Sequence, residues 1–573
     1  MEKNDLLDVK ITDMTADGEG VGKADAFPLF IKDACVGDIV RCKVMKLKKT
    51  YGYARLMEVL SPSPDRVEPL CPKARACGGC QLQMMSFEAE NRYKTKKVRE
   101  NLRRIGGFTD LPVEECIGMP EPWHYRNKAQ VPFGYDKNGK LVAGFYAGHS
   151  HDIIDMEDCA LTFPEAGDVI RTVKNWMLRH GIRAYEEETG KGLIRHVLIR
   201  KGFSTGEILV CLIANGRKIP AAEALTAELL RIPGFHTLSV NVNTARNNVI
   251  LGTETYALYG PGYIEDTIRD IRFRISPESF YQVNPAQTEV LYGKALEFAE
   301  LTGKENVWDL YCGIGTISLF LAEKAKKVYG VEIVPRAIDD ARENARLNGF
   351  TNAEFYVGAA EEVLPAWHAA NPDERIDVIS VDPPRKGLDP RCIETILDMQ
   401  PERIVYVSCD SATLARDLKI LADGGYSVDK VQPVNQFGRT VHVETVVLLS
   451  KLHEAKHHVS VKLDMDEMDI TAAESKATYE EIKKYVAEHN DGMKVSNLYI
   501  AQVKRKCGLE LAENLRVATR RMDCSQDNST TAASDLELVP SHNLPKPEDS
   551  KQPQCPKEKE KAIMEALKAF QMI

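Results

Sequence analysis

The sequence lacks several features that mark membrane, secreted, zinc-binding or nucleic-acid-binding proteins. No apolar run approaches the roughly 18 residues that a membrane-spanning helix needs, so we expect no membrane partner. The first residues, MEKNDLLDVKITD, contain no basic segment followed by an apolar one, which predicts a cytoplasmic location. The thirteen histidines form no HExxH-type zinc motif, and a formal net charge of −9 gives no global sign of nucleic-acid binding.

The size and composition indicate a globular protein of several domains. The chain has 573 residues, and a single hydrophobic core stops growing at roughly 250–300 residues. Apolar residues make up 43% and charged residues 28%, which is ordinary globular usage. Fourteen cysteines without a secretory signal argue against a disulfide framework and for thiol or metal chemistry at some of them. We expect three or four domains and a monomer.

Residues 1–62 alternate apolar and polar positions between glycine-rich turns, which predicts a small antiparallel β-barrel. Its stretch KVMKLKKTYGYARL is basic and contains tyrosines, and SPSPDRVEPLCP follows as a linker. DGEGVG, the VGDIV turn and this linker resemble a TRAM domain, a small OB-like barrel. The resemblance implies RNA binding, although the pattern alone fits any small β-barrel module.

The rest of the chain divides into three further regions by pattern. Residues 63–270 mix short strands and a helix and predict a central α+β domain. Residues 271–452 repeat strand, helix and strand, which predicts a doubly wound parallel sheet and an α/β fold class. Residues 453–573 predict a helical extension: two helices in TYEEIKKYVAEHNDGMKVSNLYIAQVKRKCGL, a polar linker at about 523–558 and a short terminal helix.

Two motifs in residues 271–452 indicate a ligand site. In DLYCGIGTISLFLA, a strand turns through Gly313 and Gly315 into a helix, which lets a ligand approach the backbone closely. Glu332 ends the next strand, where a carboxylate can accept hydrogen bonds from ribose hydroxyls, although an isolated acid there would be read as a surface residue. With no third glycine and no Walker lysine, the pattern suits S-adenosylmethionine better than NAD or ATP. In VDPPR, two prolines stiffen the turn after Asp382, a candidate for cofactor or substrate binding.

A set of motifs in fixed order resembles a known family. SFYQVNPAQ, DLYCGIGT, VEIV, VDPPRKGL, VSCDSATLARDL and HVETV are similar to those of the uracil-5 RNA methyltransferases, which use S-adenosylmethionine on a Rossmann-like class I fold. The resemblance implies that Cys409 is the nucleophile and Glu444 the base. The positions that it assigns to cofactor binding are Gln282, Tyr311, Glu332 and Asp382.

The chemistry of uracil methylation explains why a cysteine and a carboxylate are needed together. Carbon 5 of uracil is a poor nucleophile, and a thiolate that adds at carbon 6 makes it enolate-like; a base must later remove the carbon 5 proton. Two other functions remain open. The DPP turn also resembles the site of exocyclic-amine methyltransferases, and a non-catalytic RNA-binding factor would need neither side chain. Taken alone, Cys409 would be read as a packed thiol, and Cys312 is a competing nucleophile.

A second cysteine group lies in CPKARACGGC. Cys71, Cys77 and Cys80 have a C-x5-C-x2-C spacing that puts three thiols on one loop. Such a set needs a fourth ligand, and the resemblance suggests Cys159. All-thiolate sites hold either zinc or an iron–sulfur cluster, and the spacing does not separate the two. The resemblance favours a [4Fe–4S] cluster with a structural role or a contact to RNA.

The same resemblance suggests the substrate. The branch of the family with both the barrel and the cluster cysteines acts on 23S ribosomal RNA, whereas members that lack both act on tRNA. Ribosomal RNA is therefore the first expectation and tRNA the second. The basic run Asn91–Phe108, together with Arg126 and Lys128, is expected to contact RNA, although such runs are also typical of a solvated face.

Overall fold

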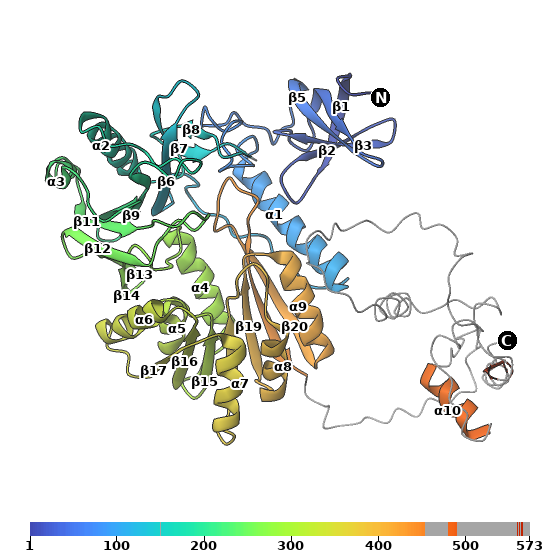
Figure 1. Cartoon of the computed structure of the whole chain (residues 1–573). Coiled ribbons are helices and arrows are strands. Elements are labelled where there is room, and N and C mark those ends of the chain that lie inside the picture. The colour runs from blue at the N-terminus through green and yellow to red at the C-terminus, as the bar shows by residue number, and fades with distance from the viewer. Residues whose placement is uncertain (149, 453–478, 490–558, 560, 562, 565–573) are drawn as a thin grey trace. The chain divides into compact units, whose positions relative to one another are not determined.

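The computed structural model describes residues 1–148, 150–452, 479–489, 559, 561, 563 and 564 (Figure 1). Internal contacts divide the chain into two units, Met1–Glu454 and Ala455–Ile573. The first unit contains a barrel and two seven-stranded sheets. Among the described residues, no helix has both the length and the apolar character needed to span a bilayer.

The N-terminal barrel is closed and has the strand order β1-β2-β3-β5-β4. Its strands are β1 Leu6–Met14, β2 Gly20–Ala24, β3 Phe27–Lys32, β4 Ile39–Leu47 and β5 Gly52–Ser61. Alternate residues such as Val9, Ile11, Leu29 and Ile31 point inward and form its core, as the period-two pattern predicts. The prediction of a wholly antiparallel barrel is wrong at one seam, because β3 and β5 run parallel with Leu29 opposite Gly52.

Helix α1, Phe87–Asn101, follows the barrel, begins at the N-cap Ser86 and continues into a short π-helical turn, Leu102–Gly106. The central sheet comes next, in the order β12-β11-β10-β9-β6-β7-β8. Its strands are β6 Lys128–Tyr135, β7 Leu141–Tyr146, β8 Ile153–Asp155, β9 Ile194–Lys201, β10 Ile208–Ala214, β11 Phe235–Val242 and β12 Glu254–Tyr259. Helices α2 Glu165–Arg179 and α3 Ala222–Leu229 pack on this sheet. The mixed α/β content predicted for this region is confirmed.

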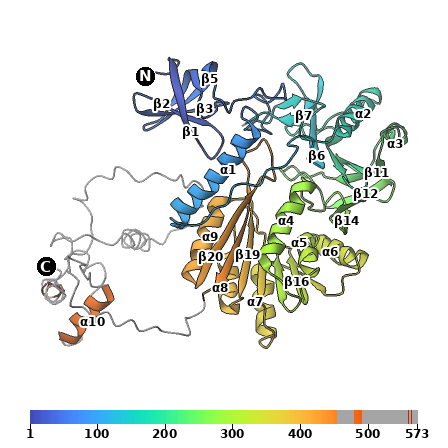
Figure 2. The same ribbon diagram turned by 180° about the vertical axis from the view of Figure 1, so that it is seen from behind.

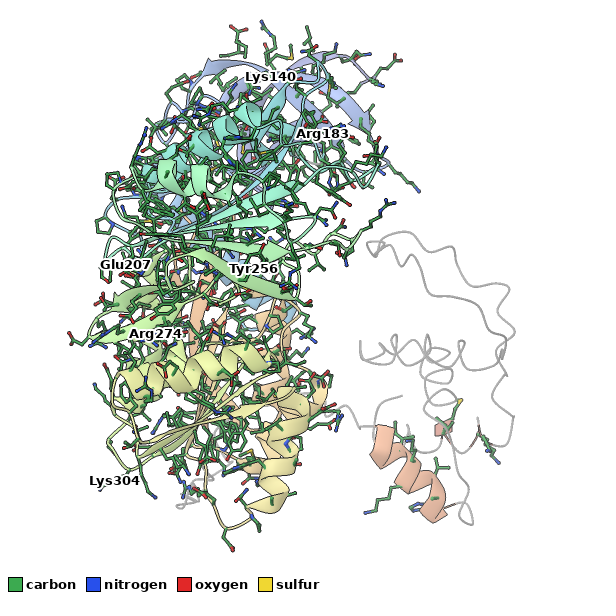
Figure 3. The ribbon with its side chains drawn as sticks, turned by 60° about the vertical axis from the view of Figure 1, so that its left-hand side comes forward. Lys140, Arg183, Glu207, Tyr256, Arg274 and Lys304 are labelled. Carbon is green, nitrogen blue, oxygen red and sulfur yellow. The ribbon has the colours of Figure 1, made fainter. Side chains whose placement is uncertain are left out.

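A hairpin connects the central sheet to the last domain. It consists of β13 Ile264–Ile268 and β14 Ile271–Ile275, and its Phe273 lies in a core shared with Leu209 and Cys211 of the central sheet. Arg274 of this hairpin donates to Glu343 on helix α6 (Pro335–Leu347) at 2.7 Å, and in Figure 3 it lies between Tyr256 of β12 and the helices below. The hairpin therefore joins the two sheets.

The C-terminal part of this unit is the predicted Rossmann-like domain. Its sheet has the order β17-β16-β15-β18-β19-β21-β20, and only β21 runs against its neighbours. The strands are β15 Asn306–Leu310, β16 Lys327–Glu332, β17 Ala353–Val357, β18 Val378–Val381, β19 Arg403–Ser408, β20 Tyr426–Val434 and β21 Glu444–Lys451. One face carries α4 Pro285–Ala299, α5 Thr316–Ala322 and α6 Pro335–Leu347; the other carries α7 Ala360–Ala370, α8 Pro390–Met399 and α9 Ser411–Asp423 (Figures 1 and 2). The expected doubly wound fold is confirmed.

In the second unit, helix α10, Tyr479–His489, coincides with the first helix predicted for the C-terminal extension. The second predicted helix, the polar linker and most of the terminal helix lie outside the described residues.

Candidate active site

A cavity of about 810 Å³ lies where β15, β16, β18 and β19 end. Ligands of open α/β sheets bind beyond the carboxyl ends of the parallel strands. The cavity lining contains all the residues that the sequence assigned to catalysis or cofactor binding: Cys409, Glu444, Gln282, Tyr311, Glu332 and Asp382. The structure therefore brings all six into one space.

Strand register puts Cys409 beside Glu444. Ser408 of β19 is paired with Thr445 of the antiparallel β21. Cys409 follows Ser408 and Glu444 precedes Thr445, so the two residues reach the same edge of the sheet. Asp410 then begins α9 by accepting hydrogen bonds from two backbone N–H groups of its first turn. Cys409 is thus fixed between a buried strand and a capped helix, with Glu444 opposite.

Burial and mutual repulsion keep protons on these two side chains. The pKa of Glu444 is raised to about 8, chiefly by burial and also by the neighbouring Asp382, while Arg385 opposes the shift. The pKa of the Cys409 thiol is raised to about 12, first by burial and then by Glu444 and Asp382, again against Arg385. A carboxyl with a pKa near 8 is suited to act as a base near neutral pH, whereas the thiol of the RNA-free protein is protonated.

The glycine turn after β15 forms another wall of the cavity. Tyr311, Gly313 and Gly315 all have positive φ angles, of 69°, 56° and 81°. A Cβ atom on Gly315 would lie 3.2 Å from both Ala341 and Phe355, so the turn packs closely against its neighbours there. The positive φ of the non-glycine Tyr311 is a local strain of the kind that concentrates at functional sites.

Acidic side chains follow the neighbouring strands. Glu332 at the end of β16 lines the cavity and accepts a hydrogen bond from the backbone N–H of Val334 at 3.0 Å. Asp382 follows β18, and withdrawal from water raises its pKa to about 7. Asp309, in β15, is fully buried, accepts a hydrogen bond from Ser318 on α5 at 2.5 Å and also has a pKa raised to about 7 by burial. The sequence analysis assigned no role to Asp309, which ties α5 to the strand before it.

Gln282 is held in place by the central domain. Asn127 lies just before β6. Its side-chain amide donates to the backbone oxygen of Gln282 at 2.9 Å, and its backbone N–H donates to the backbone oxygen of Val283 at 2.8 Å. Asn284 then caps α4 by accepting a hydrogen bond from the N–H of Gln287. The cavity wall therefore depends on both sheets.

The loop between β20 and β21, residues 435–443, supplies lining residues that the sequence analysis missed. Phe437, Thr440 and His442 all face the cavity, and Nε2 of His442 lies 3.5 Å from the guanidinium of Arg385. Burial and surrounding cations lower the pKa of His442 to about 4, so its imidazole is neutral at neutral pH. The only signal in the sequence was their position just before Glu444.

The four predicted cluster cysteines also share a cavity. Cys71, Cys77, Cys80 and Cys159 line a space of about 340 Å³, and none forms a disulfide. The pKa of Cys80 is raised to about 12, chiefly by burial and also by the other three cysteines, while a hydrogen bond with Gln83 opposes the shift. Among the described residues, however, no group of three or more His, Cys, Asp or Glu side chains is arranged to hold a metal ion. The cluster therefore stays a prediction.

This cysteine cavity adjoins the larger one. Gly79 and Arg126 line both spaces, so the wall between them is thin. Lys128 faces the cysteine cavity, and burial, together with Arg200 and Arg126, lowers its pKa to about 7. Lys128 is half-buried with its side chain on this cavity, and its contact with RNA stays a prediction.

The basic run on α1 is largely occupied by ion pairs within the chain. Arg92 pairs with Asp65, Lys94 with Glu90, Lys96 with Asp13, Arg99 with Glu115 and Arg103 with Glu100. The pairs of Arg92, Lys96 and Arg99 fix α1 to its surroundings, whereas those of Lys94 and of Arg103, in the π-helical turn, lie within the helical segment. All five reduce the charge offered to RNA.

The barrel presents a better surface for RNA bases. Phe30 and Tyr51 are stacked with ring centroids 5.2 Å apart, and Tyr53 meets both rings edge-on. Lys46 lies opposite Tyr53 on the neighbouring strand, and Lys48 is exposed next to this group. Aromatic rings beside cations are typical of single-strand binding surfaces.

The parallel sheet, its glycine turn and its terminal carboxylates define a class I S-adenosylmethionine-dependent methyltransferase fold. Residues 221–452 match the family model described as tRNA (Uracil-5-)-methyltransferase, and residues 2–57 match the TRAM domain. The chain belongs to the uracil-5 RNA methyltransferase family with an N-terminal TRAM domain.

Relatives support this membership along the first unit. An uncharacterized RNA methyltransferase of Halalkalibacterium halodurans is 54% identical over 450 residues, which cover 78% of this chain and 98% of the relative. One from Listeria monocytogenes is 49% identical over 449 residues, with the same coverage of both chains. The crystal structure of Pyrococcus abyssi tRNA (uracil-54, C5)-methyltransferase with S-adenosyl-L-homocysteine matches with a TM-score of 0.62 and 27% identity, covering 77% of this chain and 99% of that one.

Proposed function

We propose that this protein transfers a methyl group from S-adenosylmethionine to carbon 5 of a uridine in 23S ribosomal RNA through a covalent adduct on Cys409. The observation that carries the proposal is the register of β19 and β21, which places a cysteine and a buried carboxylate side by side in the same cavity as Glu332 and Asp382. An enzyme that methylates an exocyclic amine has no use for this cysteine and base.

The chain's own residues account for the steps around the methyl transfer. Cys409 gives its proton to water as its sulfur bonds to carbon 6, and the electron pair of the carbon 5–carbon 6 double bond moves onto the ring as an enolate. S-adenosylmethionine, when bound, supplies an electrophilic methyl group. Glu444 then takes the proton from carbon 5, and the bond between sulfur and carbon 6 breaks to restore the double bond and release Cys409. Arg385, the cation that favours the ionised forms of both residues, offsets the negative charge near them.

The residues that would hold the cofactor fit its functional groups. Glu332 offers a carboxylate at the position where ribose hydroxyls are bound in this fold, and the turn at Gly313 gives a ligand access to the backbone. Gln282 and Asp382 add polar groups, and Tyr311 adds an aromatic ring to the same wall. The residues present therefore suit S-adenosylmethionine.

Both RNA classes remain candidates, for separate reasons. The barrel and the four cysteines favour 23S ribosomal RNA through the branch of the family that they characterise. The Pyrococcus abyssi neighbour, by contrast, is a tRNA (uracil-54, C5)-methyltransferase and is matched along 99% of its length. tRNA is therefore the second candidate substrate.

Mapping of 5-methyluridine tests this proposal directly. In cells that lack the protein, mass spectrometry of digested RNA is expected to show loss of 5-methyluridine at one or more positions of 23S ribosomal RNA. Complementation with the wild-type chain should restore the mark, and complementation with Cys409→Ala should not. Loss confined to tRNA would select the second candidate, and an unchanged map of both RNAs would contradict uridine methylation.

We further infer that Cys71, Cys77, Cys80 and Cys159 hold a [4Fe–4S] cluster. Four cysteine thiolates are the ligands of such clusters, and all four line one cavity. Zinc is held by the same thiolate ligands, and the spacing of the cysteines does not separate the two; the family resemblance is what favours the cluster. It would join the Cys71–Cys80 loop to the segment after β8.

Iron and sulfide analysis checks this assignment. Protein purified without oxygen is expected to be brown and to contain about four iron atoms per chain, and Cys159→Ser is expected to lose most of the iron and the visible absorption. Cys116→Ala, which removes a buried thiol outside the cavity, serves as the control and should keep both. Stoichiometric zinc without iron or sulfide would overturn the assignment.

A further inference from the structure

Helix α1 lies between the TRAM barrel and the loop that precedes Glu444. Three of its side chains make hydrogen bonds to segments that are distant in the sequence. Tyr93 bonds to the barrel, more than 70 residues earlier, and Lys94 and Lys97 bond to the loop, more than 300 residues later. α1 also contacts α9, the helix that follows Cys409, and the two lie near each other in Figures 1 and 2. α1 is thus in contact with both sides of the proposed catalytic pair.

The first half of this contact is a fully buried ion pair. Lys94 and Glu90 are both inaccessible to solvent, and their side chains meet at 2.9 Å. Lys94 also donates to the side chain of Asn435 and to the backbone oxygen of Phe437, at 2.5 and 2.9 Å, while Glu90 accepts from the N–H of Arg439 at 3.0 Å. A buried pair keeps its charges only when such hydrogen bonds satisfy them. Here loop 435–443 provides them, through the side chain of Asn435 and the backbone of Phe437 and Arg439.

The second half joins the same loop to the barrel. The ammonium of Lys97 donates to the backbone oxygen of Ala16 in the turn between β1 and β2 and to that of Val441 in the loop, both at 3.0 Å. The hydroxyl of Tyr93 lies 2.9 Å from the oxygen of the same Ala16. Gly18, with a φ of 83°, packs so closely that a Cβ atom there would be 2.8 Å from Val441. The barrel turn therefore rests directly on the loop.

The loop held in this way forms part of the cavity. Phe437, Thr440 and His442 line it and Glu444 follows immediately. Backbone bonds at its middle add support, because the N–H groups of Gln81 and Leu82 donate to the oxygen of Arg439 at 3.0 and 3.1 Å. A shift of the barrel turn or of α1 would move these lining side chains together.

We propose that the TRAM barrel is a positioning element of the catalytic centre: its turn at Thr15–Gly18, clamped by Lys97, sets the loop that places Glu444. This inference rests on the proposed function, since it takes Glu444 as the base. It gives the barrel a second role that is separate from binding RNA. Lys97 acts as a positioning residue, because it reaches the cavity only through the backbone of the loop.

Two variants break the contact from opposite sides. Lys97→Met keeps the length of the side chain and removes the ammonium, and Gly18→Ala introduces a methyl group against Val441. Displacing catalytic groups by about 1 Å can cost about 10²-fold in rate, so we expect kcat to fall by about 10- to 100-fold while KM for RNA changes little. Lys97→Arg should recover part of kcat, because a guanidinium can donate to both carbonyls.

Each variant has a matched control. Lys96→Met removes the same charge from the next residue of α1, whose ion pair with Asp13 reaches the barrel but not the loop. Gly139→Ala strains a glycine with a φ of 77° that has open space where its Cβ would be. Both controls should keep the wild-type kcat. A Lys97→Met protein that raises KM without lowering kcat would instead make Lys97 an RNA contact and overturn the proposal.

Hydrogen exchange separates this inference from the proposed function, because it needs no activity. Amides of residues 435–443 and 15–18 should exchange faster in Lys97→Met and Gly18→Ala than in wild type, and not in Lys96→Met or Gly139→Ala. This result would support the positioning role even if the chain methylates no uridine. Unchanged exchange in both test variants would refute it, whatever the kinetics.

Discussion

Cys409→Ala is expected to abolish methylation, with a loss of roughly 10⁴- to 10⁶-fold, the scale on which removal of a covalent nucleophile acts. Without the sulfur of Cys409, the proposed addition to carbon 6 does not take place, and carbon 5 stays unreactive. The sharper measurement uses RNA that carries 5-fluorouridine. Fluorine replaces the carbon 5 proton, and a base cannot remove it. The wild-type adduct is therefore trapped and survives denaturation on a gel. Cys409→Ala should form none.

Cys312→Ala is the informative comparison, because Cys312 is the other cysteine in the cavity lining. Burial raises the pKa of Cys312 well above its usual range, and neighbouring Asp309 and Glu332 raise it further. We expect Cys312→Ala to keep forming the adduct. An adduct that disappears in Cys312→Ala and persists in Cys409→Ala would show that Cys312, and not Cys409, is the nucleophile. No adduct with the wild-type chain would favour the exocyclic-amine reaction at the DPP turn.

The sequence predicts the cavity well because strand ends in a parallel sheet meet at one edge. Glu332 and Asp382 each follow an apolar run, so their proximity follows from the βαβ pattern. The pairing of Cys409 with Glu444 depends on β21 running against β19, since Glu444 begins its strand whereas Cys409 follows the end of its own. The family's motif order supplied that pairing before the strand direction was known.

What the sequence could not predict depends on contacts across long separations. The cations of α1 form a basic run and suggest an RNA surface, but their partners Asp65, Asp13 and Glu115 become visible only in three dimensions. Lys94 is a fully buried cation in a helix of low mean hydropathy, which no local pattern signals. The cavity-lining role of loop 435–443 likewise follows from its anchors on α1.

The environment of Cys409 also differs from the usual picture of a reactive cysteine. Such thiols are commonly activated by nearby cations that lower the pKa, whereas burial, and then Glu444 and Asp382, raise the pKa of Cys409 against the effect of Arg385. Cys409 and Glu444 are therefore suited to a reaction in which the negative charge leaves the sulfur as soon as it forms. Addition to carbon 6 has this property, because the negative charge moves onto the uracil ring.

The pH dependence of stability reports on Glu444 without any substrate. Its folded-state pKa of about 8 lies above its ordinary value of 4.5, so the unfolded chain binds fewer protons than the folded one between these values. Stability is then expected to fall as pH rises from about 4.5 to about 8 and to level off above that. Glu444→Gln should lose less stability over this range than wild type, measured as Tm.

Glu444→Gln is expected to stop the reaction after methyl transfer, so that a covalent adduct accumulates with natural RNA. Glutamine keeps the size of the side chain but cannot take the carbon 5 proton, and loss of a general base costs roughly 10²- to 10⁴-fold in turnover. In wild type, kcat/KM should rise with pH until about 8 as Glu444 ionises, and the variant should lose this limb.

A denaturing gel with radiolabelled natural RNA detects the adduct, and Glu444→Gln with Cys409→Ala is the control that should abolish it. Rapid turnover by Glu444→Gln, or slow turnover with no adduct, would show that another group removes the proton.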